Sequence, residues 1–189
     1  MNKRICAMIL GTMFAVSGLI FAQDSPNLLK NSDLKIENSI LKDWSVGLGG
    51  NCKYVQTAGY KGKNSVLIPV EGVPPGAPAG LENYRKEIMT QTVSGLKPGK
   101  YIFSAYIKLN RKIDGVVLIR IIQLAGKEEY EGPNLKGPDQ PEPEVWGKVM
   151  AEFNIPAGAS WATIAFDFRD ISPGATVCVD SPSLTYKPE

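Results

Sequence analysis

The sequence predicts an all-β domain, a two-sheet antiparallel β-sandwich, from three observations. Apolar and polar residues alternate with the period of two that a strand with one buried face requires. The alternating runs are short and separated by Gly, Pro, Asn and Asp, at roughly the 8–12-residue spacing of sandwich strands. The period of 3.6 residues that is typical of an amphipathic helix is almost absent. The expected strands are residues 27–30, 43–47, 52–57, 65–70, 87–93, 100–109, 116–123, 146–155, 161–169 and 175–186.

The N-terminus resembles a secretory signal peptide in its build. Lys3 and Arg4 precede an uncharged apolar run, residues 5–21, and Ala22 offers a small residue for cleavage. The alternative is an uncleaved membrane anchor, because the run is only slightly shorter than the ~18–20 residues that span a bilayer. We therefore expect a signal peptide, residues 1–22, and one domain, residues 23–189, in a secreted, periplasmic or extracellular protein.

Charge and composition exclude several classes of function. The chain has 21 Lys and Arg against 19 Asp and Glu, so no nucleic-acid or anionic-membrane partner is indicated. It has no histidine, which excludes histidine triads and histidine-ligated zinc. A glycosidase needs only two carboxylates, but Glu128, Glu129 and Glu131 form a run that is typical of a solvated loop. We therefore expect a protein that is not an enzyme and has no cofactor.

Two cysteines, Cys52 and Cys178, follow the signal peptide. An oxidising compartment allows them to pair, and a bridge across so long a loop stabilises by roughly 4–5 kcal/mol in the chain-entropy model. Two buried free thiols are the alternative, because unpaired cysteine behaves as a small hydrophobic residue. The residues by themselves leave both alternatives open.

Alternation also assigns the faces of the strands, most clearly in residues 100–109 and 161–169. Their core faces comprise Tyr101, Phe103, Ala105, Ile107, Ala162, Ile164, Phe166 and Phe168. Their water-facing sides comprise Ser104, Tyr106, Lys108, Thr163, Ala165, Asp167 and Arg169. Residues 116–123 are apolar on both faces except at Arg120 and Gln123, which predicts a central strand.

The water-facing side combines an aromatic ring with charged groups. Sugars stack flat C–H patches on such rings, and their hydroxyls pair with carboxylates and guanidinium groups. Tyr106 beside Arg120, Asp167 and Arg169 would supply both kinds of contact if the three strands are neighbours. A salt-bridge network beside an ordinary exposed tyrosine is the alternative.

Five further aromatic residues divide between the core and the loops. Trp44 and Trp146 lie beside apolar residues, and we expect them in the core. Tyr84 and Tyr130 lie in the Pro- and Gly-rich segments 71–86 and 124–145, which we expect to be long loops, and Trp161 lies at a strand end. These three residues are candidates for the rim of a binding groove, although ordinary packing is the alternative for each.

Four segments follow one another in an order that is typical of one family. They are residues 27–34 with Trp44, residues 91–108, residues 146–156 and residues 177–184. Together they resemble the carbohydrate-binding modules of the CBM-cenC type, in the galactose-binding-like jelly-roll family, over nearly all of the mature chain. The resemblance implies a two-sheet jelly roll that binds sugar across a concave sheet or in loops at its edge.

The resemblance also implies where the candidate residues lie. It places residues 65–70, 100–109, 116–123 and 161–169 in one sheet, so that Tyr106, Arg120, Asp167 and Arg169 share an outer face. It makes the strand that starts at Cys52 a neighbour of the closing strand, which implies a Cys52–Cys178 disulfide.

A structural calcium ion is common among the modules that the sequence resembles. Asp180 matches the acidic calcium ligand of their closing strand, but Lys35 stands where a second acid is expected. Because a lysine opposes the binding of a hard dication, we expect the protein to fold without calcium.

We therefore expect a non-catalytic module that binds a polysaccharide or oligosaccharide and, by resemblance, serves glycoside hydrolysis. The sequence leaves two alternative functions open. One is a structural or protein-interaction β-sandwich of the cell envelope that does not bind sugar. The other is a lone glycosidase or lyase.

Overall fold

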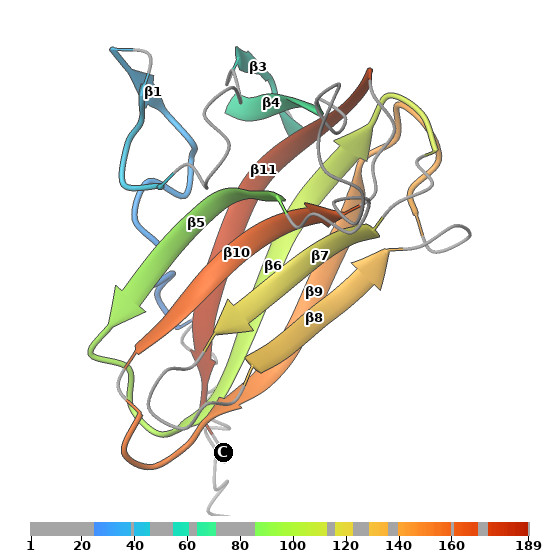
Figure 1. Cartoon of the computed structure of the whole chain (residues 1–189). Helices are drawn as coiled ribbons and strands as arrows, with labels where there is room; N and C mark the ends of the chain where they lie inside the picture. Colours follow the sequence, from blue (N-terminus) through green and yellow to red (C-terminus); the bar gives the residue numbers. More distant parts are fainter. Residues whose placement is uncertain are drawn as a thin grey trace, which may run out of the picture.

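The chain forms two antiparallel sheets packed face to face (Figure 1). One sheet has four strands in the order β5-β10-β7-β8, and the other has five in the order β3-β4-β11-β6-β9. This arrangement confirms the predicted two-sheet β-sandwich. The structure is a computed structural model that describes residues 25–38, 40–45, 55–60, 64–70, 86–112, 116–122, 129–135, 140–159, 161–169 and 174–188.

The strands follow most of the predicted ranges closely. The four-stranded sheet comprises Lys86–Ser94 (β5), Trp161–Arg169 (β10), Val116–Ile122 (β7) and Glu129–Leu135 (β8). The five-stranded sheet comprises Val55–Ala58 (β3), Asn64–Val70 (β4), Ala175–Lys187 (β11), Gly99–Leu109 (β6) and Gly147–Ile155 (β9). A two-stranded hairpin pairs Ile36–Glu37 (β1) with Ile40–Leu41 (β2).

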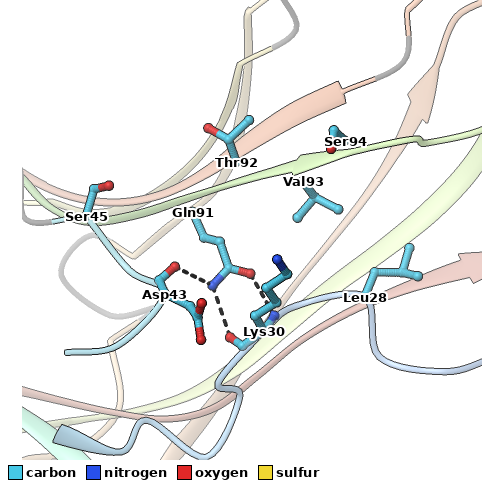
Figure 2. A pocket seen from close by; sticks show the side chains of 8 residues that line it. All are labelled: Leu28, Lys30, Asp43, Ser45, Gln91, Thr92, Val93 and Ser94. Atoms are coloured by element: carbon cyan, nitrogen blue, oxygen red, sulfur yellow. Dashed lines mark hydrogen bonds between the residues drawn. The ribbon is translucent and has the colours of Figure 1, made fainter. Parts of the chain in front are cut away.

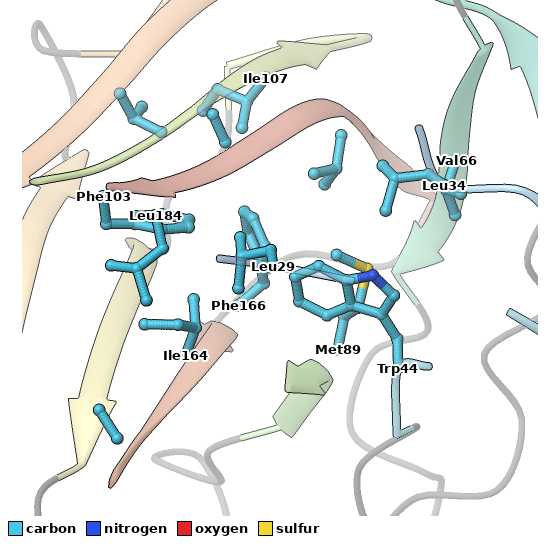
Figure 3. Close-up of a cluster of buried hydrophobic side chains, with 14 of the residues drawn as sticks. Leu29, Leu34, Trp44, Val66, Met89, Phe103, Ile107, Ile164, Phe166 and Leu184 are labelled. Carbon is cyan, nitrogen blue, oxygen red and sulfur yellow. The ribbon is translucent and has the colours of Figure 1, made fainter. Parts of the chain in front are cut away.

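The core lies between the inner faces of the two sheets (Figure 3). Every second residue of β6, from Tyr101 to Leu109, is buried, which confirms the predicted core face of this strand. Phe103 of β6 contacts Phe166 of β10 with ring centroids 5.8 Å apart, so this edge-to-face pair joins the sheets. Trp44 packs on Phe166 from the N-terminal segment at 6.2 Å, and its burial confirms its predicted place in the core.

The N-terminal segment runs along one side of the sandwich without forming the predicted strand at residues 27–30 (Figure 1). The Asn27 side chain explains this, because it takes the place of a strand neighbour for the backbone of β11. Its Oδ1 accepts the N–H groups of Leu29 and Leu184, and its Nδ2 donates to the carbonyl of Pro182. This clamp holds the chain where β11 bulges between Asp180 and Ser183.

Strand β8 corrects the predicted loop over residues 124–145. It is an edge strand that pairs only with β7 among the described strands. The register shifts between Leu118 and Arg120 of β7, opposite Gly132 and Pro133. An edge strand tolerates a proline and a bulge because one side of it needs no partner. Alternation alone missed β8 because Gly132 and Pro133 interrupt the strand and three of its other five residues are Glu or Asn, which are uncommon in strands.

Two further expectations about the sheets are wrong. Ala165, predicted to face water, is fully buried, because β10 lies between β5 and β7 and a methyl group does not project beyond its neighbours. The expectation that residues 65–70, 100–109, 116–123 and 161–169 share one sheet also fails, since β4 and β6 belong to one sheet and β7 and β10 to the other.

The predicted disulfide is not found, because Cys178 is a buried free thiol. Strand β4 lies between β3 and β11, so the strand that follows Cys52 is not the neighbour of the closing strand that the resemblance implied. Cys52 itself, the signal peptide and Tyr84 lie outside the described residues. No helix in the described part of the chain is long and apolar enough to cross a bilayer.

Candidate functional site

The predicted site is divided between the two sheets. Tyr106 lies on β6 of the five-stranded sheet, whereas Arg120 lies on β7 and Asp167 and Arg169 on β10 of the four-stranded sheet. The water-facing sides of a sandwich point away from each other, so these residues cannot form one patch. The prediction that they share an outer face is therefore wrong.

Within the four-stranded sheet, the three charged residues do lie on adjacent strands, as predicted. The backbone of Arg120 pairs with Ala165 on one side and Glu131 on the other, and Asp167 pairs with Leu118. Tyr130 belongs to edge strand β8, opposite Ile121, and does not lie in the predicted loop.

The five-stranded sheet instead gathers three aromatic residues, Tyr60, Tyr106 and Trp146, which we call the aromatic cluster. The Tyr60 and Tyr106 rings are stacked with centroids 3.9 Å apart and planes 18° apart. The Trp146 ring meets Tyr60 edge-on, at 6.4 Å and 63°. All three residues are half-buried. The cluster therefore combines packed rings with ring surface that remains open to water.

Three separate segments build this cluster. Tyr106 is on the water-facing side of β6, opposite buried Phe103 and Ile107, as alternation predicted. Tyr60 follows the end of β3, and Trp146 directly precedes β9, next to β6 in the sheet. The core placement predicted for Trp146 is wrong, because the side chain lies at the strand start on the outer surface.

Asp180 connects the Tyr60 segment to the sheet. Asp180 is on β11, directly opposite Tyr106 of β6 in the strand pairing, so the two side chains share the outer face. Its Oδ2 accepts the backbone N–H of Tyr60, and its Oδ1 accepts the Ser181 hydroxyl at 2.8 Å. The carboxylate is fully buried.

A charged pair borders the cluster on the side of Trp146. The Lys108 ammonium lies 5.6 Å from the centre of the Trp146 ring, within cation–π range, and 3.2 Å from the Glu144 carboxylate. Lys108 is mostly covered, whereas the Glu144 side chain is 65% exposed. Lys148 is on β9, directly opposite Tyr106 of β6 in the strand pairing. It is exposed and forms no ion pair with another described residue. The cluster thus offers ammonium and carboxylate groups at the edge of its rings.

The loop before β9 is held by tight backbone contacts. Glu144 adopts a left-handed conformation, φ 64°, and its N–H donates to the carbonyl of Leu109 at 2.7 Å. At Gly147 a Cβ atom would lie 2.4 Å from Pro141 Cγ, so a side chain there cannot fit without moving the loop. Glycine at this position therefore allows the loop to fold back and to place Trp146 beside Tyr60.

The cluster lacks the arrangement that glycoside hydrolysis requires. That reaction uses two carboxyl groups about 5–10 Å apart that both reach the substrate. Asp180 is buried beneath the cluster with both oxygens engaged, which leaves Glu144 as the accessible carboxylate among its described residues. The described cluster can bind a polyol through ring stacking and hydrogen bonds, but it offers no acid–base pair.

Calcium does not fit the described residues around Asp180. Calcium takes six to eight oxygen ligands, usually including several carboxylates. Both Asp180 oxygens already accept hydrogen bonds. Lys35, which occupies the position where a second acidic ligand was expected, forms an ion pair with Asp33 at 2.8 Å. No group of three or more Cys, Asp or Glu side chains suited to a metal occurs in the described part of the chain. Folding without calcium stays a prediction.

A hollow of about 380 Å³ lies at the edge of β5 against the N-terminal segment, away from the aromatic cluster (Figure 2). Gln91 at its base is buried and fully bonded: it accepts from Lys30 N at 2.8 Å and donates to the carbonyls of Lys30 and Asp43, both at 3.0 Å. Gln91 therefore fastens the N-terminal segment to β5. The described residues that line it include no aromatic ring: Leu28, Lys30, Asp43, Ser45, Gln91, Thr92, Val93 and Ser94.

Sequence reasoning missed most of the cluster. Lys108 was assigned to the water-facing side, and its spacing of two from Tyr106 was a usable signal. Trp146 and Glu144 precede a strand, where alternation gives no orientation. Tyr60 gave no local signal, because the contacts described for it, with Tyr106 and Asp180, come from residues far along the chain.

Comparison with known proteins shows the fold. No family model matches the sequence, and a search of curated proteins finds no match. Solved structures do match. A CBM61 module, TmCBM61, in complex with β-1,4-galactotriose has a TM-score of 0.58 at 16% identity, over 86% of this chain and 100% of that one. The CBM22-1 xylan-binding domain of Paenibacillus barcinonensis Xyn10C has a TM-score of 0.55 at 17% identity, over 87% and 97%.

The enzymatically active domain of bacteriophage CBA120 tailspike protein 4 also matches, with a TM-score of 0.59 at 18% identity. This chain covers 21% of the tailspike chain, about a fifth of its length. The CBM61 and CBM22-1 structures, in contrast, are carbohydrate-binding modules and are matched over 100% and 97% of their length. The chain therefore has the β-sandwich fold that such modules use.

Proposed function

We propose that this protein is an exported, non-catalytic carbohydrate-binding module that binds a polysaccharide or oligosaccharide at the aromatic cluster. The observation that carries the proposal is the group of half-buried rings on an outer sheet face, with Tyr60 and Tyr106 stacked and Trp146 edge-on. These rings lie on the outer face of the sheet and are not part of the core between the two sheets. Burying part of an aromatic side chain against a ligand is a common source of binding energy.

The polar groups at the rim match the other half of a sugar. Pyranose rings present C–H bonds on their faces and hydroxyls at their edges. Lys108, Glu144 and Lys148 supply donors and an acceptor around the rings. Charge-assisted hydrogen bonds of this kind contribute about 1.5–3 kcal/mol each when they are shielded from water.

The biological setting is part of the proposal. The N-terminal sequence pattern supports export to the periplasm or the outside of the cell. The motif order supports membership of the CBM-cenC type, and with it a role beside glycoside hydrolases. Modules of this fold include one solved with β-1,4-galactotriose and one described as xylan-binding, so galactan and xylan are the first glycans to test.

A glycan array probed with the purified protein tests the proposal directly. We expect binding to at least one class of glycan, and no release of reducing ends when that glycan is incubated with the protein. Turnover would support a glycosidase or lyase instead. Absence of binding to every glycan, with the protein shown to be folded by its melting transition, would refute the proposal and favour a structural or protein-interaction role.

A further inference from the structure

Asp180 is a buried carboxylate whose surroundings need an explanation. Moving an ionised carboxylate out of water is costly unless its oxygens receive hydrogen bonds. Asp180 is fully buried, and its described partners are a backbone N–H and a hydroxyl. No Lys or Arg forms an ion pair with it among the residues that the structure describes. A group maintained at this cost is expected to have a role beyond filling space.

The Tyr60 backbone lies beyond the paired residues of β3 and β4. The ladder between β3 and β4 ends at the pair Ala58 and Asn64, and Tyr60 is two residues past that end. Its N–H is therefore beyond the reach of the β4 ladder. Asp180 accepts this N–H instead, and it belongs to β11, the strand on the other side of β4 from β3.

The same hydrogen bond links the Tyr60 backbone to the strand that neighbours Tyr106. Asp180 is the Cα partner of Tyr106, so holding the Tyr60 backbone at Asp180 brings the Tyr60 ring over its neighbour. The outcome is the stack of 3.9 Å between Tyr60 and Tyr106. Ser181, in a left-handed conformation with φ 47°, donates its hydroxyl to the second oxygen and so orients the carboxylate.

We propose that Asp180 is the positioning residue of the aromatic cluster: its carboxylate binds the backbone of Tyr60 and so assembles the sugar-binding platform. This inference rests on the proposed function for its purpose, although the contact itself can be tested without any sugar. It gives this aspartate a different role from the calcium ligand that its sequence position implied.

The test measures the backbone amide of Tyr60 by ¹⁵N–¹H NMR in the wild-type protein and in Asp180→Ala, Asp180→Asn and Asp33→Asn. In the wild type we expect a downfield, exchange-protected amide, since its acceptor is charged. Asp180→Ala should speed its exchange by about tenfold or more and move the resonance upfield. Asp180→Asn keeps an acceptor oxygen without the charge, so the Tyr60 amide resonance in this variant should lie between its positions in the wild type and in Asp180→Ala. Asp33→Asn is the matched control, because its exposed carboxylate is remote in sequence and pairs with Lys35.

Binding to β-1,4-galactotriose and soluble xylan is measured on the same variants. We expect Asp180→Ala to weaken whichever probe binds by about twofold to tenfold, the effect of displacing one stacking ring. An unchanged Tyr60 amide in Asp180→Ala overturns the proposal. If that variant does not fold, an unchanged amide in Asp180→Asn overturns it equally. A shift of the wild-type amide on adding Ca²⁺ also overturns it, because the carboxylate would then be a metal ligand. If neither probe binds, the proposed function fails for these glycans while the amide still decides the role of Asp180.

Discussion

Replacing Tyr60 by alanine tests which sheet binds sugar. The substitution removes a ring that stacks on Tyr106 at 3.9 Å and meets Trp146 at 6.4 Å. A stacking contact contributes about 0.5–1.5 kcal/mol, so loss of one sugar contact should raise the dissociation constant by about 2–13-fold. The lost stack on Tyr106 should lower stability by a similar amount, and hence the melting temperature by about 1–6 °C.

Isothermal titration calorimetry with the best glycan from the array measures the first effect, and differential scanning calorimetry the second. Tyr60→Phe is the matched control, since it keeps the ring and should bind within about twofold of the wild type. Asp167→Ala, on the opposite sheet, should not change binding. The reasoning would be refuted if Tyr60→Ala bound normally while Asp167→Ala bound weakly, because the site would then lie on the four-stranded sheet.

Three further outcomes follow from local geometry and protonation. Gly99→Ala places a Cβ atom 2.9 Å from the Tyr186 ring at φ 136°, so urea unfolding should show a loss of about 1–3 kcal/mol; unchanged stability would contradict the observed backbone conformation. Gly147→Ala, whose Cβ atom would collide with Pro141, should weaken glycan binding in the same titration by displacing the loop that carries the cluster tryptophan, and normal affinity would show that this loop is dispensable. Burial raises the pKa of the Cys178 thiol from its ordinary value, so the folded state keeps this proton more tightly than the unfolded state, and the free energy of unfolding should fall as the pH rises through the ordinary thiol pKa of about 8.5; Cys178→Ala should flatten that slope in urea titrations between about pH 8 and 10, and an unchanged slope would contradict the assignment.

Much of the fold could be predicted because alternation reports burial directly. Every core residue predicted on β6 is buried, since a strand that packs on one face must place every second side chain there. The same rule correctly turned Tyr106 away from the core. It failed for β8, because an edge strand with a bulge has no burial pattern to repeat.

The candidate site was harder to predict because it depends on which strands are neighbours. Tyr106, Asp167 and Arg169 all face away from the core according to alternation, but alternation says nothing about which sheet each strand joins. Only the hydrogen-bonded order separated β6 from β10 and thereby divided the predicted patch. The neighbouring-strand argument for the disulfide failed for the same reason, since β4 separates β3 from β11.

The sequence by itself determined the class of this protein: an all-β sandwich, with strand positions close to those found and a chemistry without histidine. These properties depend on local patterning and composition, which one chain displays completely. The tertiary structure alone decided the composition of the aromatic cluster. Tyr60, Tyr106 and Trp146 are far apart in sequence, and the contacts that join them arise only when β11 brings Asp180 beneath Tyr60 and β9 pairs with β6. Such long-range contacts depend on strand order, and strand order follows from the packing of the whole domain.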